Sequence, residues 1–259
     1  MMLDPNAFLR KLPHVLDPTQ RIFLEAIVFS TDAMDICFNR ILATAQHYRL
    51  DIFSSGDFIK KQMIMDSWAI VDFVHNIRQS LFRLGFQVKP GARKDFFDNF
   101  EAATLLRNAM DHIGSNARNI ANRKVRLPIY GVLGYLYFPG GVPSGGQGNG
   151  GNSDCYAIAL SSGRAENGTQ FPIINPHGLE IRGMVCQFKI DAFSFSLNLE
   201  EAIVAARAMI DELNARAEDD ITSKMKELVD REGGNLEELL HHGPVGTSIC
   251  LKYSFENGG

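Results

Sequence analysis

Hydrophobic residues in the first half of the chain recur at steps of three and four residues, which is typical of helices with one buried face. This pattern predicts a helix from about Pro18 to Tyr48, preceded by a capping Asp17. It predicts a second helix from about Asp57 to Leu84, which Gly85 ends. Two long helices joined by a short break are therefore expected at the start of the chain.

The third predicted helix, from about Ala92 to Arg123, has the clearest hydrophobic stripe. The stripe comprises eight apolar residues at steps of three and four: Phe96, Phe100, Ala103, Leu106, Met110, Ile113, Ala117 and Ile120. The other side of this helix is polar: Asn108, His112, Ser115, Asn116, Asn119 and Arg123. Three long helices with short connections predict an antiparallel helical bundle.

After Lys124 the pattern becomes rich in β-forming residues and partly alternating, which predicts strands. These segments are Ile129 to Phe138, Cys155 to Leu160 and Met184 to Phe195. Between the first two lies a glycine-rich segment, Pro139 to Asn152. It contains a G-x-G-x-x-G spacing, but a strand-like stretch rather than a helix follows, so we interpret it as a mobile loop and not as a dinucleotide site.

The rest of the chain predicts a long helix from Leu199 to about Arg231, ended by Gly233 and Gly234. A short helical piece from Leu236 to His241 and a last strand from Ser248 to Phe255 follow. The predicted fold class is α+β, an antiparallel helical bundle with an inserted small antiparallel sheet. Its expected parts are a bundle over 1–124, a β-rich insertion over 125–198, and a further bundle helix with a strand over 199–259.

Composition narrows the class of protein. The chain has 259 residues, 45% of them hydrophobic and 22% charged, which is ordinary for a globular protein and excludes a wholly disordered one. The formal net charge of −4 provides no global basic field, so an anion site must be local. The apolar runs are too short for a membrane span, and the N-terminus lacks the apolar region of a secretory signal. We therefore expect a cytoplasmic protein without a membrane partner.

The cysteines are widely scattered: Cys37, Cys155, Cys186 and Cys250. No Cys-x-x-Cys pair and no histidine at zinc-finger spacing accompanies them. We interpret them as small buried residues in the reduced state, and we expect neither a metal nor a cofactor.

Arg107, Asn108 and His112 form the candidate catalytic set. An arginine can hold a phosphate through two parallel hydrogen bonds. A histidine titrates near neutral pH and can move a proton to or from a ribose 2′-hydroxyl or a leaving oxygen. Together these groups are sufficient for RNA cleavage without a metal.

The spacing Arg107-Asn108-x-x-x-His112 resembles the R-N-x-x-x-H signature of the HEPN superfamily (higher eukaryotes and prokaryotes nucleotide-binding domains). HEPN domains are helical bundles, and many are metal-independent ribonucleases of toxin, defence or RNA-processing systems. The resemblance covers roughly residues 18–124, with 199–231 as a candidate further helix, and leaves the β-rich part unexplained. It implies an RNA endonuclease in which Arg107 stabilises charge on the scissile phosphate, His112 acts as general base or acid, and Asn108 positions one of them or the RNA.

Helical geometry separates Arg107 from His112. Five residues at about 100° each leave Arg107 and His112 roughly 140° apart around a straight helix. They converge on one phosphate only if the helix is distorted or a second chain contributes. HEPN ribonucleases are similar to the second case, and we therefore expect a homodimer formed mainly by the helical half.

Further residues are candidates for substrate binding. Between Arg107 and Arg126 there are five basic residues against one acid, Asp111, and Arg118, Arg123 and Lys124 belong to this patch. A basic helix end that complements the helix dipole explains the same charges. On the second helix, Asp72 is a candidate to orient Arg107 or His112, or to contact its neighbour His75, which is also a candidate.

Two other interpretations remain open. Arg107 and Asp111 are four residues apart and form an ordinary helix-surface pair in a non-catalytic HEPN-like module that dimerises or binds a protein partner. The third hypothesis is a small-molecule pocket between bundle and sheet, lined by some of the 18 phenylalanines.

Overall fold

The protein combines long helices with one small antiparallel sheet, as expected of the α+β class. The computed structural model describes residues 1–13, 16–115, 128–140, 154–161, 163, 171, 174 and 183–239. Most of the glycine-rich segment and the expected C-terminal strand, Ser248 to Phe255, lie outside these residues. The helices and strands of the described residues are η1 Phe8–Arg10, α1 Pro18–Tyr48, η2 Arg49–Phe53, α2 Asp57–Arg83, α3 Ala92–Asn99, α4 Glu101–Asp111, β1 Val132–Tyr137, β2 Tyr156–Ser161, β3 Val185–Ala192, β4 Phe195–Asn198, α6 Leu199–Glu232 and α7 Leu236–Leu239.

The two long helices α1 and α2 begin and end where the sequence predicts. At the start of α1 the side chain of Asp17 accepts a hydrogen bond from the backbone N–H of Gln20 at 2.9 Å, and Pro18 occupies the first turn. At the end of α2, Gly85 adopts φ +74° and the N–H of Phe86 donates to the carbonyl of Leu81. This left-handed glycine closes the helix and turns the chain back.

The single helix predicted over Ala92 to Arg123 is wrong. Helices α3 and α4 cover residues 92–111 of this range, and they are separated at Phe100, whose φ of −115° and ψ of 31° are not helical. A further helical stretch at 113–115 follows a turn at His112. Helix α4 ends at Asp111. The hydrophobic spacing did not reveal the break, because Phe100 is buried at the bend just as it would be in a straight helix.

The four strands form one antiparallel sheet in the order β2-β1-β3-β4. The predicted β segment from Met184 to Phe195 folds back on itself, because Phe193 and Ser194 have φ of 53° and 76°. Two successive residues with positive φ make the tight turn that suits the twist of a hairpin. One hydrophobic segment thus becomes β3, a turn and the first residue of β4.

A bulge in β3 connects the sheet to α6. Gln187 has φ of 61°, and the pairing of β1 with β3 shifts register at this position. The backbone N–H of Gln187 donates to the carboxylate of Glu200 at 2.8 Å. Helix α6 begins here, and the side-chain oxygen of Asn198 accepts a hydrogen bond from the backbone N–H of Glu201. The hydrogen bond between Gln187 and Glu200 therefore connects the bulge to the start of α6.

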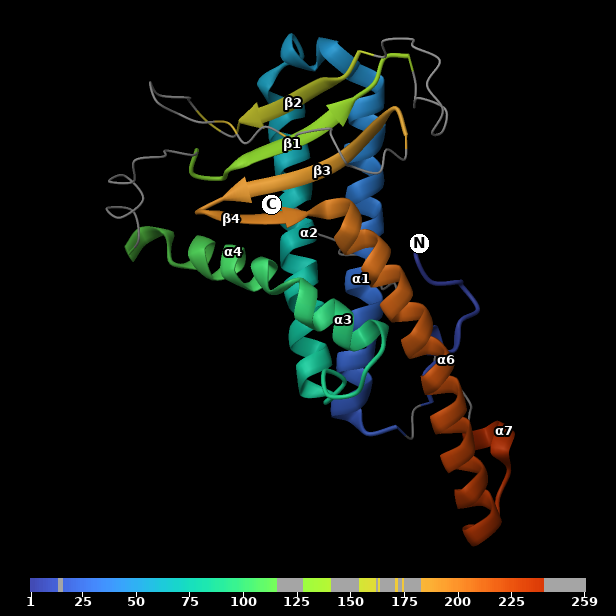
Figure 1. Ribbon diagram of the computed structural model, residues 1–259. Helices are drawn as coiled ribbons and strands as arrows, with labels where there is room; N and C mark the ends of the chain where they lie inside the picture. The colour runs from blue at the N-terminus through green and yellow to red at the C-terminus, as the bar shows by residue number, and fades with distance from the viewer. Residues whose placement is uncertain are drawn as a thin grey trace, which may run out of the picture.

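One hydrophobic core joins the helices to the inner face of the sheet. Figure 1 shows α1 and α2 side by side, with the sheet across one end of them and α6 running away from the edge of the sheet. Helix α4 contacts α2 and β4, and α3 contacts α6. The core includes residues from every layer: Ile27, Met34, Val74, Leu106, Tyr135, Phe188, Ile190 and Met209. A small separate cluster, Leu136, Phe138 and Cys186, covers the other face of the sheet.

Candidate functional site

Arg107 joins α4 to α2 through two carboxylates. Its Nη1 lies 2.7 Å from Oδ1 of Asp72, which comes from α2. Its Nε lies 3.1 Å from both carboxylate oxygens of Asp111, one turn further along α4. The contact between Arg107 and Asp72 and the pair with Asp111 are both among the arrangements that the sequence suggests.

Solvent reaches all three members of this cluster. The side chains of Arg107, Asp72 and Asp111 are 35%, 43% and 51% exposed. The hydrogen bonds to Asp72 and then to Asp111 raise the pKa of Arg107 above its ordinary value, so the guanidinium stays charged. Among the described residues, its Nη2 amino group has no hydrogen-bond partner and can donate to a ligand.

His75 lies at the inner end of the same junction. Its Nδ1 is 3.2 Å from the hydroxyl of Thr104 on α4, and Arg78 Nε donates to that hydroxyl at 3.4 Å. Burial lowers the pKa of His75, and the positive charge of Arg107 lowers it further. The neutral imidazole is therefore favoured near pH 7. No hydrogen bond joins His75 to Asp72 in the described part of the chain.

His112 and Asn108 lie at the exposed end of α4. The backbone N–H of His112 donates to the carbonyl of Asn108 at 3.1 Å, and His112 has φ of −100° and ψ of 21°, outside the helix. Both side chains are exposed. Neither belongs to the lining of the groove described below. The described structure thus brings Arg107 and Asp72 together and leaves His112 apart from them.

The remaining predicted binding residues lie outside the described part of the chain. They are Arg118, Arg123 and Lys124, together with Arg126 of the same basic patch. The proposed role of this patch in binding an RNA backbone stays a prediction.

A groove of about 770 Å³ opens beside Arg107, between α2, α4 and the segment that precedes β1. Its walls are mostly aromatic and aliphatic, with charged groups at Arg107 and three other residues. The lining residues are Lys61, Ile64, Met65, Trp68, Ala69, Asp72, Arg107, Met110, Asp111 and Tyr130. An apolar concave surface with a few placed polar groups is the usual composition of a ligand site.

Sequence reasoning missed most of this groove. Trp68 fits the apolar stripe of α2 and reads as a core residue, but it is only partly buried and lines the groove. Lys61, Trp68 and Asp72 are seven and four residues apart, a spacing that places them on one face of α2. This combination of charged and aromatic residues on one helix face was the signal in the sequence that could have indicated the groove. Nothing in the sequence indicated that Tyr130, 62 residues after Trp68, accepts a hydrogen bond from its indole.

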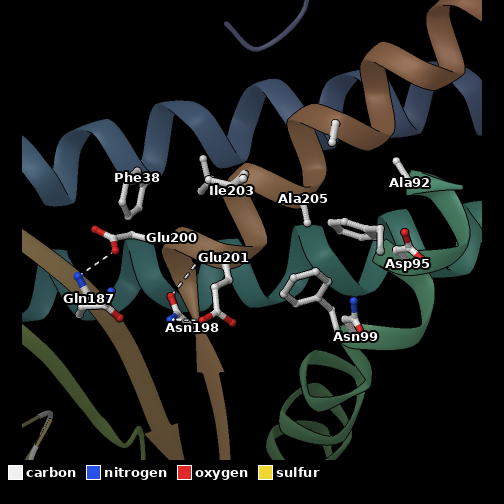
Figure 2. A pocket seen from close by; sticks show the side chains of 14 residues that line it. Phe38, Ala92, Asp95, Asn99, Gln187, Asn198, Glu200, Glu201, Ile203 and Ala205 are labelled. Carbon is white, nitrogen blue, oxygen red and sulfur yellow. Dashed lines mark hydrogen bonds between the residues drawn. The ribbon is translucent and has the colours of Figure 1, made fainter. Parts of the chain in front are cut away.

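A second cavity, of about 900 Å³, lies where α1, α3 and α6 meet the sheet. It is placed where the third hypothesis expects a small-molecule pocket, and Phe38, Phe96 and Phe100 are among its lining residues. Figure 2 shows Glu200 directed at Gln187, and Glu201 beside Asn198. These two carboxylates are therefore engaged in starting α6.

Within the described ranges, no group of three or more His, Cys, Asp or Glu side chains is placed to hold a metal ion. Of the helices described, none is long and apolar enough to cross a membrane. Cys37 and Cys155 are free thiols.

Comparison with known proteins provides no relative. No family model, curated protein or solved structure matches the chain.

Proposed function

We propose that the protein is a HEPN-like, metal-independent endonuclease of single-stranded RNA that acts in the cytoplasm. The observation that carries the proposal is the fixed position of Arg107, 2.7 Å from Asp72 and 3.1 Å from Asp111, at the edge of an aromatic groove. Two carboxylates orient the guanidinium before substrate arrives, which reduces the cost of ordering it on binding. The R-N-x-x-x-H spacing supplies the histidine.

The proposed reaction uses the RNA itself as nucleophile. The ribose 2′-oxygen attacks the adjacent phosphorus and loses its proton to a base, while the bond to the 5′-oxygen breaks and that oxygen gains a proton from an acid. The products are a 2′,3′-cyclic phosphate and a 5′-hydroxyl. Arg107 stabilises the charge that develops on the phosphate oxygens, and His112 transfers a proton. Asn108 positions the histidine or the RNA.

A second copy of the chain is part of the proposal, because His112 is outside the groove that contains Arg107. The exposed face of α1 is suited to such pairing. Three exposed apolar residues recur at steps of seven along α1: Ile22, Phe29 and Ile36, which are 59%, 68% and 52% exposed. Ala26 and Ala33 lie between them. In an antiparallel pair centred on Phe29, Ile22 faces Ile36 of the partner subunit, so this face is self-complementary under a two-fold axis.

The nuclease test compares wild type with two variants on a mixed RNA substrate in EDTA. His112→Ala and Arg107→Ala should each lower cleavage by about 100-fold or more. The matched controls are His47→Ala and Arg21→Ala, which change an exposed histidine and a helix-surface arginine of α1. DNA of the same sequence should resist cleavage because it lacks the 2′-hydroxyl. Equal activity in wild type and His112→Ala would assign the cleavage to a contaminant or another site.

The dimer test measures mass by light scattering. Wild type should give about twice the chain mass of 28.8 kDa. Phe29→Glu should give the single-chain mass, because it places two carboxylates opposite each other at the two-fold axis. Phe53→Glu, at a similarly exposed phenylalanine outside α1, should stay dimeric. A wild-type monomer at micromolar concentration would remove the composite site.

The second candidate is a non-catalytic HEPN-like module that dimerises or binds a protein. The observation that favours it is the double ion pair, since Asp72 and Asp111 already neutralise Arg107. A wild-type protein that dimerises through Phe29 and cleaves no RNA would support this candidate over the nuclease.

A further inference from the structure

The aromatic wall of the groove beside Arg107 is built from three parts of the chain. The indole N–H of Trp68 on α2 donates to the carbonyl of Tyr130 at 2.8 Å. The ring of Trp68 also contacts Phe193 edge-on, at 6.3 Å between centroids, in the turn between β3 and β4. Trp68 is therefore held from both the sheet and the segment before β1.

Gly131 fixes the place of Tyr130 in this wall. It has φ of +78°, and a Cβ at this position would lie 2.3 Å from the backbone carbonyl oxygen of Asp191. Only glycine permits the chain to pass this close to β3. Tyr130 is half exposed and lines the groove. The wall thus presents aromatic surface to solvent from a constrained backbone.

The charged groups of the groove suit an anion with a polar, planar neighbour. In the ranges that the structure describes, the Nη2 amino group of Arg107 has no hydrogen-bond partner, and Lys61 is a second cation in the lining. Asp72 and Asp111 offer carboxylate oxygens that can accept hydrogen bonds from ring or exocyclic N–H groups. A nucleotide combines these features, since it carries a flat base with N–H donors close to a phosphate.

We infer that this groove binds one nucleotide unit of single-stranded RNA, with the base against Trp68, Tyr130 and the two methionines and the phosphate at Arg107 and Lys61. This inference rests on the proposed function for the choice of RNA, and it adds the part of the substrate that the site holds. Met65 and Met110 supply adaptable apolar surface that accepts bases of different shape. The groove volume of about 770 Å³ is within the range of nucleotide-sized ligand sites.

The chain contains a built-in reporter for this test, because Trp68 is its only tryptophan. Intrinsic fluorescence is followed while the protein is titrated with the four nucleoside 5′-monophosphates, the matching nucleosides and ribose 5-phosphate. We expect a saturable change with the monophosphates, and binding at least about 10-fold weaker for ribose 5-phosphate, which lacks the base that stacks. No saturable change with any monophosphate up to millimolar concentration would overturn the inference.

Two matched variants test the position of the ligand. Tyr130→Ala should weaken monophosphate binding by about 10-fold, since one stacking surface is lost. Tyr156→Ala, at a tyrosine of similar exposure on β2, should bind as wild type. Arg107→Ala should weaken the monophosphates and leave the weaker binding of nucleosides unchanged. Circular dichroism checks that Tyr130→Ala is folded, and a folded Tyr130→Ala that binds as wild type would contradict the inference.

Two further comparisons separate this inference from the proposed cleavage. His112→Ala should bind the monophosphates as wild type does, while it loses cleavage. If wild type cleaves RNA but its Trp68 fluorescence does not change with any monophosphate, the nuclease proposal stands and the nucleotide site is overturned. A single-stranded RNA hexamer should bind at least about 10-fold tighter than a monophosphate, because it adds phosphate contacts. A hexamer that binds no tighter would assign the groove to free nucleotides and overturn the RNA part.

Discussion

Arg93 and Arg107 each join neighbouring helices of this protein through carboxylates, and they differ in how much solvent reaches them. At the junction of α3 and α6, Arg93 lies 3.2 Å from Glu212, and the two side chains are 5% and 19% exposed. At the junction of α2 and α4, Arg107 pairs with Asp72 and Asp111, which are far more exposed. The same pairing closes one junction and leaves a guanidinium edge accessible at the other.

The closed junction satisfies its charges within the protein. Besides the side chain of Arg93, Glu212 accepts the backbone N–H of Arg93 at 3.2 Å and contacts Arg216 Nε at 3.1 Å. The guanidinium of Arg93 lies 4.6 Å from the centroid of the Phe86 ring. Because Arg93 is buried and paired in this way, we assign it a structural role.

The difference shows what burial does to an ion pair. Breaking a buried pair leaves an uncompensated charge in a poorly solvated place, whereas water takes over when an exposed pair is broken. Mutations at the closed junction should therefore change stability, and mutations at the open junction should change binding.

The largest expected effect is at the closed junction. Glu212→Ala should lower the free energy of unfolding by about 3–5 kcal/mol, because the buried guanidinium of Arg93 loses its main partner. Urea unfolding measures the change. The matched control is Glu25→Ala, which breaks the exposed pair with Arg21 and should cost less than about 1 kcal/mol. A loss at Glu212→Ala as small as at the control would remove the distinction between the junctions.

The open junction should respond in the opposite way. Arg107→Ala should cost less than about 1 kcal/mol of stability, since Asp72 and Asp111 remain solvated. The same variant should abolish most cleavage and weaken nucleotide binding. Urea unfolding and Trp68 fluorescence on one preparation measure both. A loss of several kcal/mol with unchanged binding would mean that Arg107 is structural, like Arg93.

A smaller effect is expected from salt, which should weaken the exposed ion pair more than the buried one. The coupling energy between Arg107 and Asp72, from a double-mutant cycle of alanine variants, should be under about 1 kcal/mol and should fall toward zero in about 1 M salt. The Debye length is then about 3 Å, so the exposed pair is screened. The coupling between Arg93 and Glu212 should change little. Equal salt sensitivity of the two couplings would contradict the assigned difference in solvent access.

The two junctions also show how far sequence reasoning reaches. Caps and stop signals at Asp17, Gly85 and Gly233 predict the ends of α1, α2 and α6, because these are local backbone effects. The pair of Arg107 and Asp111 is equally local. In contrast, Arg93 and Glu212 are 119 residues apart, and nothing near either residue indicates the other.

The break at Phe100 and the turn at Phe193 are a second limit. Both interrupt continuous hydrophobic patterns, and neither carries a glycine or proline that would announce it. The groove was missed because its aromatic wall depends on Tyr130, in the segment before β1, lying against Trp68 of α2. Periodicity identifies which residues are buried or polar, but tertiary packing decides where a segment bends.

The smallest expected effect is the pH dependence of stability that His75 contributes. His75 lies at the buried end of the junction of α2 and α4. Burial first, and then the charges of Arg107 and Arg78, lower the pKa of His75 below its ordinary 6.5, while Asp72 and Asp111 partly oppose this. These groups come from α2 and α4, the elements that form the junction. In the unfolded chain His75 binds a proton at higher pH than in the folded protein.

This difference makes stability depend on pH in a defined direction. As pH falls below about 6.5, the unfolded state takes up the proton first, so His75 contributes a loss of folding free energy that is absent above that pH. The free energy of unfolding should therefore fall more steeply between about pH 7.5 and pH 5.5 in wild type than in His75→Gln. His47→Gln, at an exposed histidine of α1, should keep the wild-type slope. A slope unchanged by His75→Gln would mean that solvent reaches the imidazole as freely as it reaches Arg107, and that the open character of the junction extends through to Thr104.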